Sequence, residues 1–245
     1  MYTYNPIEDC YATKKKILIF RDELQFLRKK IKRLNILDFG CGNANDFGKY
    51  FFNQFDNYTG FDIHQPSINF ANKNFSKKNI RFTTKSPHSK FDVILVSEVL
   101  EHLDNPQKTL IFLNSLLNKN GIILASTPNG YGLTEIEKFI IHKFGIYKLL
   151  RRIYKIIKKP TKLKKEKIPF NFDSGHIQFF TFRQLKKIIN NASLKLSYIK
   201  NGTVLGADIS GSTILKFECT KKLNTFLADF LPTSFSATWI FKLVK

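Results

Sequence analysis

The segment from Ser97 to Leu103, S-E-V-L-E-H-L, carries the side chains best suited to chemistry. Two carboxylates and an imidazole follow one another at spacings of three and four residues, so they would project from one face if the segment begins a helix. Carboxylates favour Mg²⁺ or Mn²⁺, and the imidazole also admits Zn²⁺ or Fe²⁺. With a downstream histidine as fourth ligand, the candidate metal ligands are Glu98, Glu101, His102 and His176.

The two histidines also have an interpretation that needs no metal. In a metal-free site, His102 or His176 is a candidate catalytic base, because an imidazole can accept a hydroxyl proton at neutral pH. Either histidine can equally be an ordinary hydrogen-bonding residue, and the carboxylates can be caps or surface charges. The residues alone leave these interpretations open.

A glycine-rich turn precedes this segment, in the sequence I-L-D-F-G-C-G-N-A-N-D of residues 36–46. Gly40 and Gly42 can take backbone angles closed to other residues, so the chain can turn sharply and pass close to a ligand. Asp62 ends the next expected strand, at about the 20-residue spacing of an acid that binds ribose hydroxyls. The pair predicts a cofactor cradle.

The wording L-D-F-G-C-G-N of residues 37–43 resembles the first motif of the class I S-adenosylmethionine-dependent methyltransferases. By this resemblance the first acid and both glycines line the methionine end of the cofactor, and Asp62 holds the ribose. Ubiquinone-pathway O-methyltransferases and small-RNA 2′-O-methyltransferases carry an E-x-x-E-H segment similar to this one. In the RNA enzymes it holds a metal, whereas many sugar methyltransferases carry it without one. The candidate cofactor-binding residues are Asp38, Gly40, Gly42, Asp62, Ile63 and Ser97.

Strand-like and helix-like segments alternate, which predicts an α/β fold with a parallel sheet. An amphipathic helix is expected over residues 14–33, and further helical segments over 46–55 and 181–191. The family resemblance implies a Rossmann-like, seven-stranded, mostly parallel sheet with helices on both faces, whose last strand is antiparallel. The expected strands span residues 35–39, 58–63, 80–83, 91–96, 121–127, 194–199 and 235–244.

Composition predicts a single domain over residues 1–245, with a basic helical insertion near 134–168 and a C-terminal insertion near 202–234. Three widely spaced cysteines without a C-x-x-C pair fit a reducing, cytoplasmic setting, and no apolar run is long enough to span a membrane. The net charge of +21 and the basic stretch 148–167 suit an anionic membrane surface or a phosphorylated ligand. AT-rich codon bias explains the charge equally well.

These observations favour an S-adenosylmethionine-dependent methyltransferase acting on a hydroxyl of a small molecule. By resemblance of the segment H-I-Q-F-F-T-F-R and the tail L-P-T-S-F-S-A-T, the acceptor is a sugar, phosphorylated or nucleotide-linked precursor of a bacterial surface glycan. A metal-dependent RNA 2′-O-methyltransferase is the main alternative, less favoured because no stacking-type basic stretch is present. The second alternative is a non-catalytic protein that binds the cofactor.

Overall fold

The computed structural model of the protein describes residues 12–132, 177–206, 215 and 217–245. Its centre is a seven-stranded sheet in the order β3-β2-β1-β4-β5-β7-β6. All its strands run parallel except β7, which lies antiparallel between β5 and β6. The predicted α/β sheet is therefore confirmed. Its strands are β1 (Asn35–Phe39), β2 (Asn57–Phe61), β3 (Ile80–Thr83), β4 (Phe91–Ser97), β5 (Leu117–Pro128), β6 (Lys195–Asn201) and β7 (Thr238–Val244).

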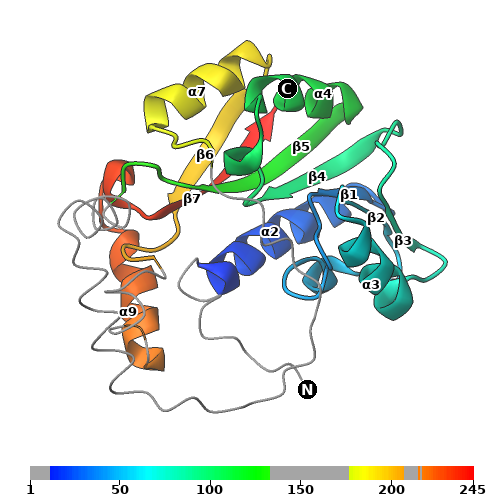
Figure 1. Ribbon diagram of the computed structural model, residues 1–245, viewed down its shortest axis with the longest axis horizontal. Coiled ribbons are helices and arrows are strands. Elements are labelled where there is room, and N and C mark those ends of the chain that lie inside the picture. Colours follow the sequence, from blue (N-terminus) through cyan, green and yellow to red (C-terminus); the bar gives the residue numbers. More distant parts are fainter. Residues whose placement is uncertain (1–11, 133–176, 207–214, 216) are drawn as a thin grey trace.

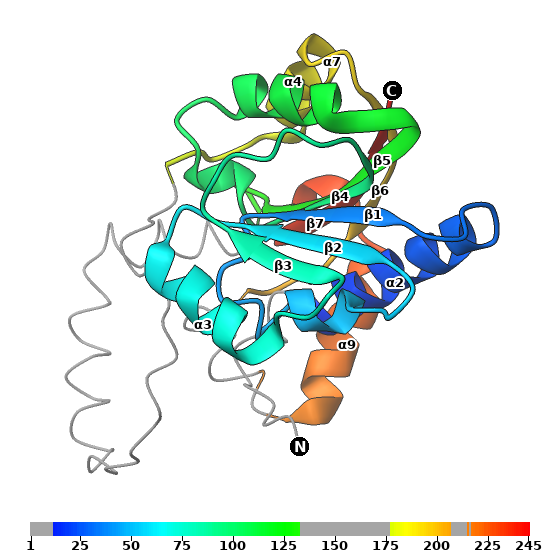
Figure 2. The same cartoon turned by 90° about the vertical axis from the view of Figure 1, so that its right-hand side faces the viewer.

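Helices cover both faces of the sheet. On one face lie α2 (Thr13–Arg28) and α3 (Gln65–Phe75), and on the other lie α4 (Pro106–Leu116) and α7 (Phe182–Asn191) (Figures 1 and 2). A further helix, α9 (Glu218–Ala228), stands beside the beginning of α2. Among the helices of the described ranges, none combines the length and the hydropathy that crossing a bilayer requires.

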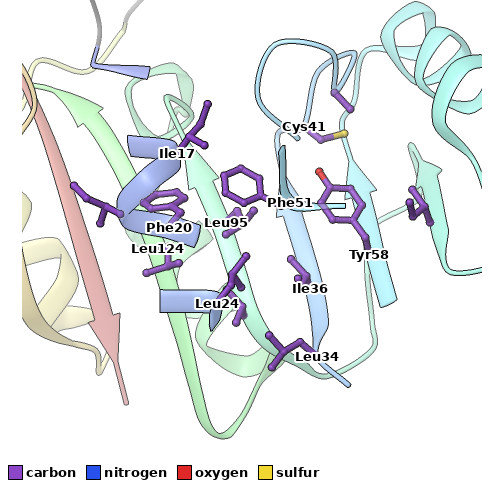
Figure 3. Packing of buried hydrophobic residues seen from close by; sticks show 14 of the residues in the cluster. Ile17, Phe20, Leu24, Leu34, Ile36, Cys41, Phe51, Tyr58, Leu95 and Leu124 are labelled. Carbon is purple, nitrogen blue, oxygen red and sulfur yellow. The ribbon is translucent and has the colours of Figure 1, made fainter. Parts of the chain in front are cut away.

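The core forms on both faces of the central strands. In β4, Val93 and Leu95 belong to the cluster under α2 and α3, whereas Ile94 and Val96 belong to the cluster under α4 and α7. This alternation follows from the two-residue period of a strand, and it explains why β4 is apolar on both faces. Phe20 of α2 is fully buried on the face of the sheet, near Leu95 of β4 and Leu124 of β5 (Figure 3). The packing fixes α2 across the sheet.

The expected helix over residues 14–33 is confirmed as α2, which ends earlier, at Arg28. The expected helix over residues 46–55 is wrong: the chain forms only a short 3₁₀ turn, η1 (Gly48–Phe51). Asn and Asp side chains compete for backbone groups in such a segment. The side chain of Asn43 accepts from the Asn45 amide at 2.9 Å, and Ala44 takes a left-handed φ of 58°.

The two predicted insertions differ in what the structure describes of them. The basic insertion near 134–168 lies outside the described residues, and so does the stretch 148–167. The stretch predicted as an insertion near 202–234 includes α9, and the 3₁₀ turn η3 (Thr233–Phe235) lies at its end.

Candidate functional site

The turn after β1 requires glycine. Gly40 and Gly42 have φ of 77° and 54°, in the left-handed region that glycine adopts without strain. The amides of Gly40 and Cys41 both donate to the carbonyl of Phe61, at 2.8 and 3.0 Å, which ties the turn to the end of β2. A side chain at Gly40 would come within 2.5 Å of Val99. The turn is thus held between β2 and the segment that follows β4.

Asp62 is fixed by the same turn. Its Oδ2 accepts from the Gly42 amide and its Oδ1 from the His64 amide, both at 2.8 Å. Each carboxylate oxygen keeps further acceptor capacity, and a Cβ added at Gly42 would meet no neighbouring atom of the described residues within 4 Å. Ile63, the next residue, is 80% exposed although apolar. The structure therefore brings the predicted glycine turn, the acid and an exposed apolar side chain together.

Asp38 takes a different position from the other predicted cofactor residues. Its carboxylate is buried and accepts the hydroxyl of Tyr58. Burial raises the pKa of Asp38 to about 7; the Tyr58 hydrogen bond opposes this rise and the Asp62 charge adds to it. Asp38 is thus held in the interior by Tyr58 of β2, two residues before the glycine turn, and its contact with the methionine end of a cofactor stays a prediction.

The S-E-V-L-E-H-L segment does not begin an α-helix, and the expectation of one shared face is wrong. The amide of Glu98 donates to the carbonyl of Ser126 at 3.0 Å, which extends the pairing of β4 with β5 by one residue. Glu98 then takes a left-handed φ of 55°, and only a 3₁₀ turn, η2 (Leu100–His102), follows. The hydroxyl of Ser97 lies 3.3 Å from that of Ser126.

Lys16 is a site residue that the sequence reasoning missed. It is buried on α2, and its ammonium donates to Glu98 Oε1 at 3.0 Å and to Ser126 Oγ at 3.1 Å. The Ser126 hydroxyl also donates to Glu98 Oε1, at 2.5 Å. Helical spacing could have predicted the burial of Lys16, because it stands four residues before Phe20 and eight before Leu24, and both of these are buried.

Glu101 and His102 both lie on the 3₁₀ turn η2. The buried side chain of Glu101 accepts a hydrogen bond from the Thr127 hydroxyl through Oε2, at 3.1 Å. The backbone carbonyl of Glu101 accepts the amides of Ile177 and Gln178, both at 2.9 Å. Burial, and then the charge of Glu98, raise the pKa of Glu101 well above its usual range. Within the described residues Glu101 Oε1 has no hydrogen-bond partner, and His102 Nε2 lies 3.8 Å from it.

The predicted metal site is not assembled by these residues. Among the residues that the structure places, no group of three or more His, Cys, Asp or Glu side chains could hold an ion. Glu98 already binds the positive charge of Lys16, and a divalent cation would have to displace that ammonium. Glu101, which was predicted to share the metal with Glu98, is deeply buried on η2. His176, the fourth predicted ligand and the alternative base, lies outside the described residues.

Comparisons with known proteins agree with this geometry. A family model described as a methyltransferase domain matches residues 13–198. The chain is 30% identical over 137 residues to a ubiquinone biosynthesis O-methyltransferase of Pelagibacter ubique, covering 53% of this chain and 55% of that protein. It is 34% identical over 106 residues to the enzyme of that name in Rickettsia typhi, covering 40% and 43%. The chain thus spans about half the length of the curated relatives it matches.

Solved structures share the fold at low sequence identity. Magnesium protoporphyrin IX methyltransferase from Synechocystis PCC 6803, with S-adenosylhomocysteine bound, superposes with a TM-score of 0.57 at 12% identity, covering 100% of this chain and 89% of that one. A plantazolicin methyltransferase, also with S-adenosylhomocysteine bound, superposes with a TM-score of 0.55 at 17% identity, covering 98% and 87%.

Proposed function

The chain belongs to the class I S-adenosylmethionine-dependent methyltransferase family, and from this premise we propose that it methylates a hydroxyl oxygen of a small molecule. The observation that carries the proposal is the carboxylate of Asp62, which the amides of Gly42 and His64 hold beside an open glycine turn. This arrangement suits a ligand with two neighbouring hydroxyls, as a ribose has.

The proposed cofactor site uses three features of the chain. Asp62 would accept the ribose hydroxyls, the exposed Ile63 would pack on the adenine, and the Gly40–Gly42 turn would let the methionine end approach the backbone. Ser97, where β4 ends, borders the same edge of the sheet. The bound cofactor supplies a methyl group that is already activated by its positive sulfur, so the protein must mainly align the acceptor and remove its proton.

His102 is the proposed base. It stands on η2, directly after the segment in which Val99 contacts the glycine turn, and its side chain is 24% exposed. The imidazole would accept the hydroxyl proton as the acceptor oxygen takes the methyl group of the bound cofactor, whose sulfur would thereby lose its positive charge. Glu101, whose Oε1 lies 3.8 Å from His102 Nε2, would help to orient the imidazole ring.

The acceptor that we propose differs from the glycan precursor expected from the sequence. The glycan precursor expected from the sequence rests on resemblance alone, and no relative reported above supports it. The two curated relatives reported above are named for ubiquinone biosynthesis, and on this ground we propose a hydroxylated ubiquinone precursor as the first acceptor to test. The match covers only about half of those proteins, so their names do not establish the acceptor of this chain, and an experiment must identify it.

The test is transfer of labelled methyl from S-adenosylmethionine into a cell extract separated into quinone-precursor, phosphorylated small-molecule and RNA fractions. We expect label in the quinone-precursor fraction, and none with His102→Gln, which should still bind S-adenosylhomocysteine in calorimetry. Label in the phosphorylated fraction would return the acceptor to the glycan-precursor class. Label confined to RNA, or a His102→Gln enzyme with full turnover, would contradict the proposal.

EDTA in the same assay tests the metal interpretation. The proposal routes no step through a metal, because Lys16 already neutralises Glu98. Turnover should therefore survive EDTA. If EDTA abolishes turnover while S-adenosylhomocysteine binding persists, Glu98, Glu101 and His102 must be reassigned as metal ligands.

A further inference from the structure

The helix α9 presents its apolar side chains outward. An ordinary surface helix buries its apolar stripe and exposes its polar residues. In α9 the buried positions are instead Lys221, Asn224 and Ala228. Phe226 is 58% exposed and Phe230, just after the helix, is 71% exposed. The other large apolar side chains exposed on this segment are Phe217, Leu223 and Leu227.

Hydrogen bonds lock the rotation of α9 in this orientation. The side-chain oxygen of Asn224 accepts the amides of Val204 and Leu205 at 3.1 and 2.8 Å, and its amide group donates to the Leu205 carbonyl at 2.9 Å. At the other end, the Asn201 side chain donates to the carbonyls of Ala228 and Leu231 at 2.8 and 2.7 Å. Because turning the helix would break these bonds, the outward apolar face is a built feature.

The exposed apolar residues form one continuous stripe. Leu223, Phe226, Leu227 and Phe230 follow the i, i+3, i+4, i+7 spacing of a single helix face. The rings of Phe226 and Phe230 stack edge to face, with centroids 4.9 Å apart. A contiguous apolar face of this kind marks a site that contacts another apolar surface.

The charge around the stripe identifies the surface that it suits. Lys14 and Lys15 of α2 pair with Glu218 and Asp229, at 3.2 and 2.5 Å, and neutralise both acids of the α9 segment. Of the two lysines of α9, Lys221 is buried and Lys222 is exposed beside the stripe, on a chain whose net charge is +21. A second copy of this chain would meet like charge, whereas anionic lipid headgroups would attract the protein as a whole.

We propose that the exposed face of α9 docks the protein on an anionic lipid bilayer, with Leu223, Phe226, Leu227 and Phe230 entering the headgroup region. A helix with an apolar face and flanking lysines lies in the plane of such an interface. Figure 1 shows α9 beside the first turns of α2, the helix whose Lys16 binds Ser126, and the Ser126 hydroxyl lies 3.3 Å from that of Ser97 in the proposed cofactor site. Docking would therefore hold the site close to the membrane surface.

The test uses the full chain and vesicles, with no substrate. Sedimentation with vesicles of equal parts phosphatidylcholine and phosphatidylglycerol should pull down the protein, and vesicles of phosphatidylcholine alone should do so weakly. The double variant Phe226→Ser/Phe230→Ser should lower partitioning by about tenfold or more, since two aromatic side chains no longer leave water. Phe26→Ser/Phe55→Ser, at two exposed phenylalanines elsewhere, is the matched control.

Further measurements separate docking from misfolding and from self-association. The variant Phe230→Trp should show a blue shift of its emission when anionic vesicles are added, and none with phosphatidylcholine alone. Both double variants should bind S-adenosylhomocysteine as the parent does, so that failure of docking is distinct from failure of the proposed methyl transfer. Equal vesicle binding by both double variants would overturn the proposal. So would a stable dimer that Phe226→Ser/Phe230→Ser converts to a monomer.

Discussion

Replacing Asp38 by Asn tests whether this buried acid costs the fold stability at neutral pH. Burial raises the pKa of Asp38 from 3.8 to about 7 in the folded protein. Between those two values the folded chain keeps a proton that the unfolded chain has released, so the stability contributed by Asp38 falls as pH rises. This direction is opposite to that of an ordinary salt-bridged carboxylate. An asparagine at this position can still accept the Tyr58 hydroxyl, and it has no charge to bury.

The magnitude follows from the size of the shift. One pKa unit corresponds to about 1.4 kcal/mol, and the free energy of unfolding changes by that amount per pH unit between roughly pH 4 and pH 7. From pH 5 to pH 7 the parent protein should therefore lose about 2 kcal/mol of stability through this one group. Asp38→Asn should not show this loss. Its free energy of unfolding, relative to that of the parent, should therefore rise by about 2 kcal/mol from pH 5 to pH 7.

Urea unfolding at pH 5, 6 and 7 measures this difference directly, because contributions from all other groups cancel between the two proteins. The variant Asp104→Asn, at an exposed acid, controls for the loss of one negative charge. Its stability should run parallel to that of the parent. If the curves of the parent and Asp38→Asn also run parallel, Asp38 is ionised throughout and the reasoning from burial is refuted.

Three further predictions concern the cofactor turn and the buried ion pair. Asp62→Asn should weaken S-adenosylhomocysteine binding by about tenfold to a hundredfold in calorimetry, because charge-assisted hydrogen bonds are lost; unchanged affinity would remove Asp62 from the site. Gly40→Ala should lower the unfolding free energy by about 1–3 kcal/mol in urea titrations, and adding Val99→Ala should restore part of it; no restoration would mean that the backbone angle alone matters. Lys16→Met should cost about 3 kcal/mol in the same assay, since it leaves the carboxylate of Glu98 without its counter-charge, and Glu98→Gln in that background should recover stability.

The parts of the fold that could be predicted depend on neighbours in sequence. The strands of the sheet and the helix α2 follow from periods of two and of 3.6 residues, and the turn at Gly40 follows from glycine's access to left-handed angles. Asp62 could be placed because its distance along the chain from the turn is a property of one strand–helix–strand unit. These features need no knowledge of distant contacts.

The parts that could not be predicted depend on contacts between distant segments. Lys16 meets Glu98 and Ser126 across more than eighty residues, and helical spacing, which places it on the buried face of α2, does not identify these partners. The helix expected at Glu98 fails because Ser126 holds its amide in the sheet. The outward apolar face of α9 depends on the hydrogen bonds that Asn224 makes with the separate segment at Val204 and Leu205.

The position of β7 has a consequence for how the sheet is completed. It is the last strand along the described chain, yet it lies between β5 and β6 and pairs with both. Until β7 arrives, β5 has an open edge and β6 has no strand to join, so the cofactor half of the sheet can form before the other half closes. A chain cut before Thr238 would leave the edge of β5 unpaired and β6 without a partner strand. A free peptide of residues 238–244, or the same strand of another chain, has the sequence to pair with both, so β7 is a suitable place to divide the protein into two complementing fragments.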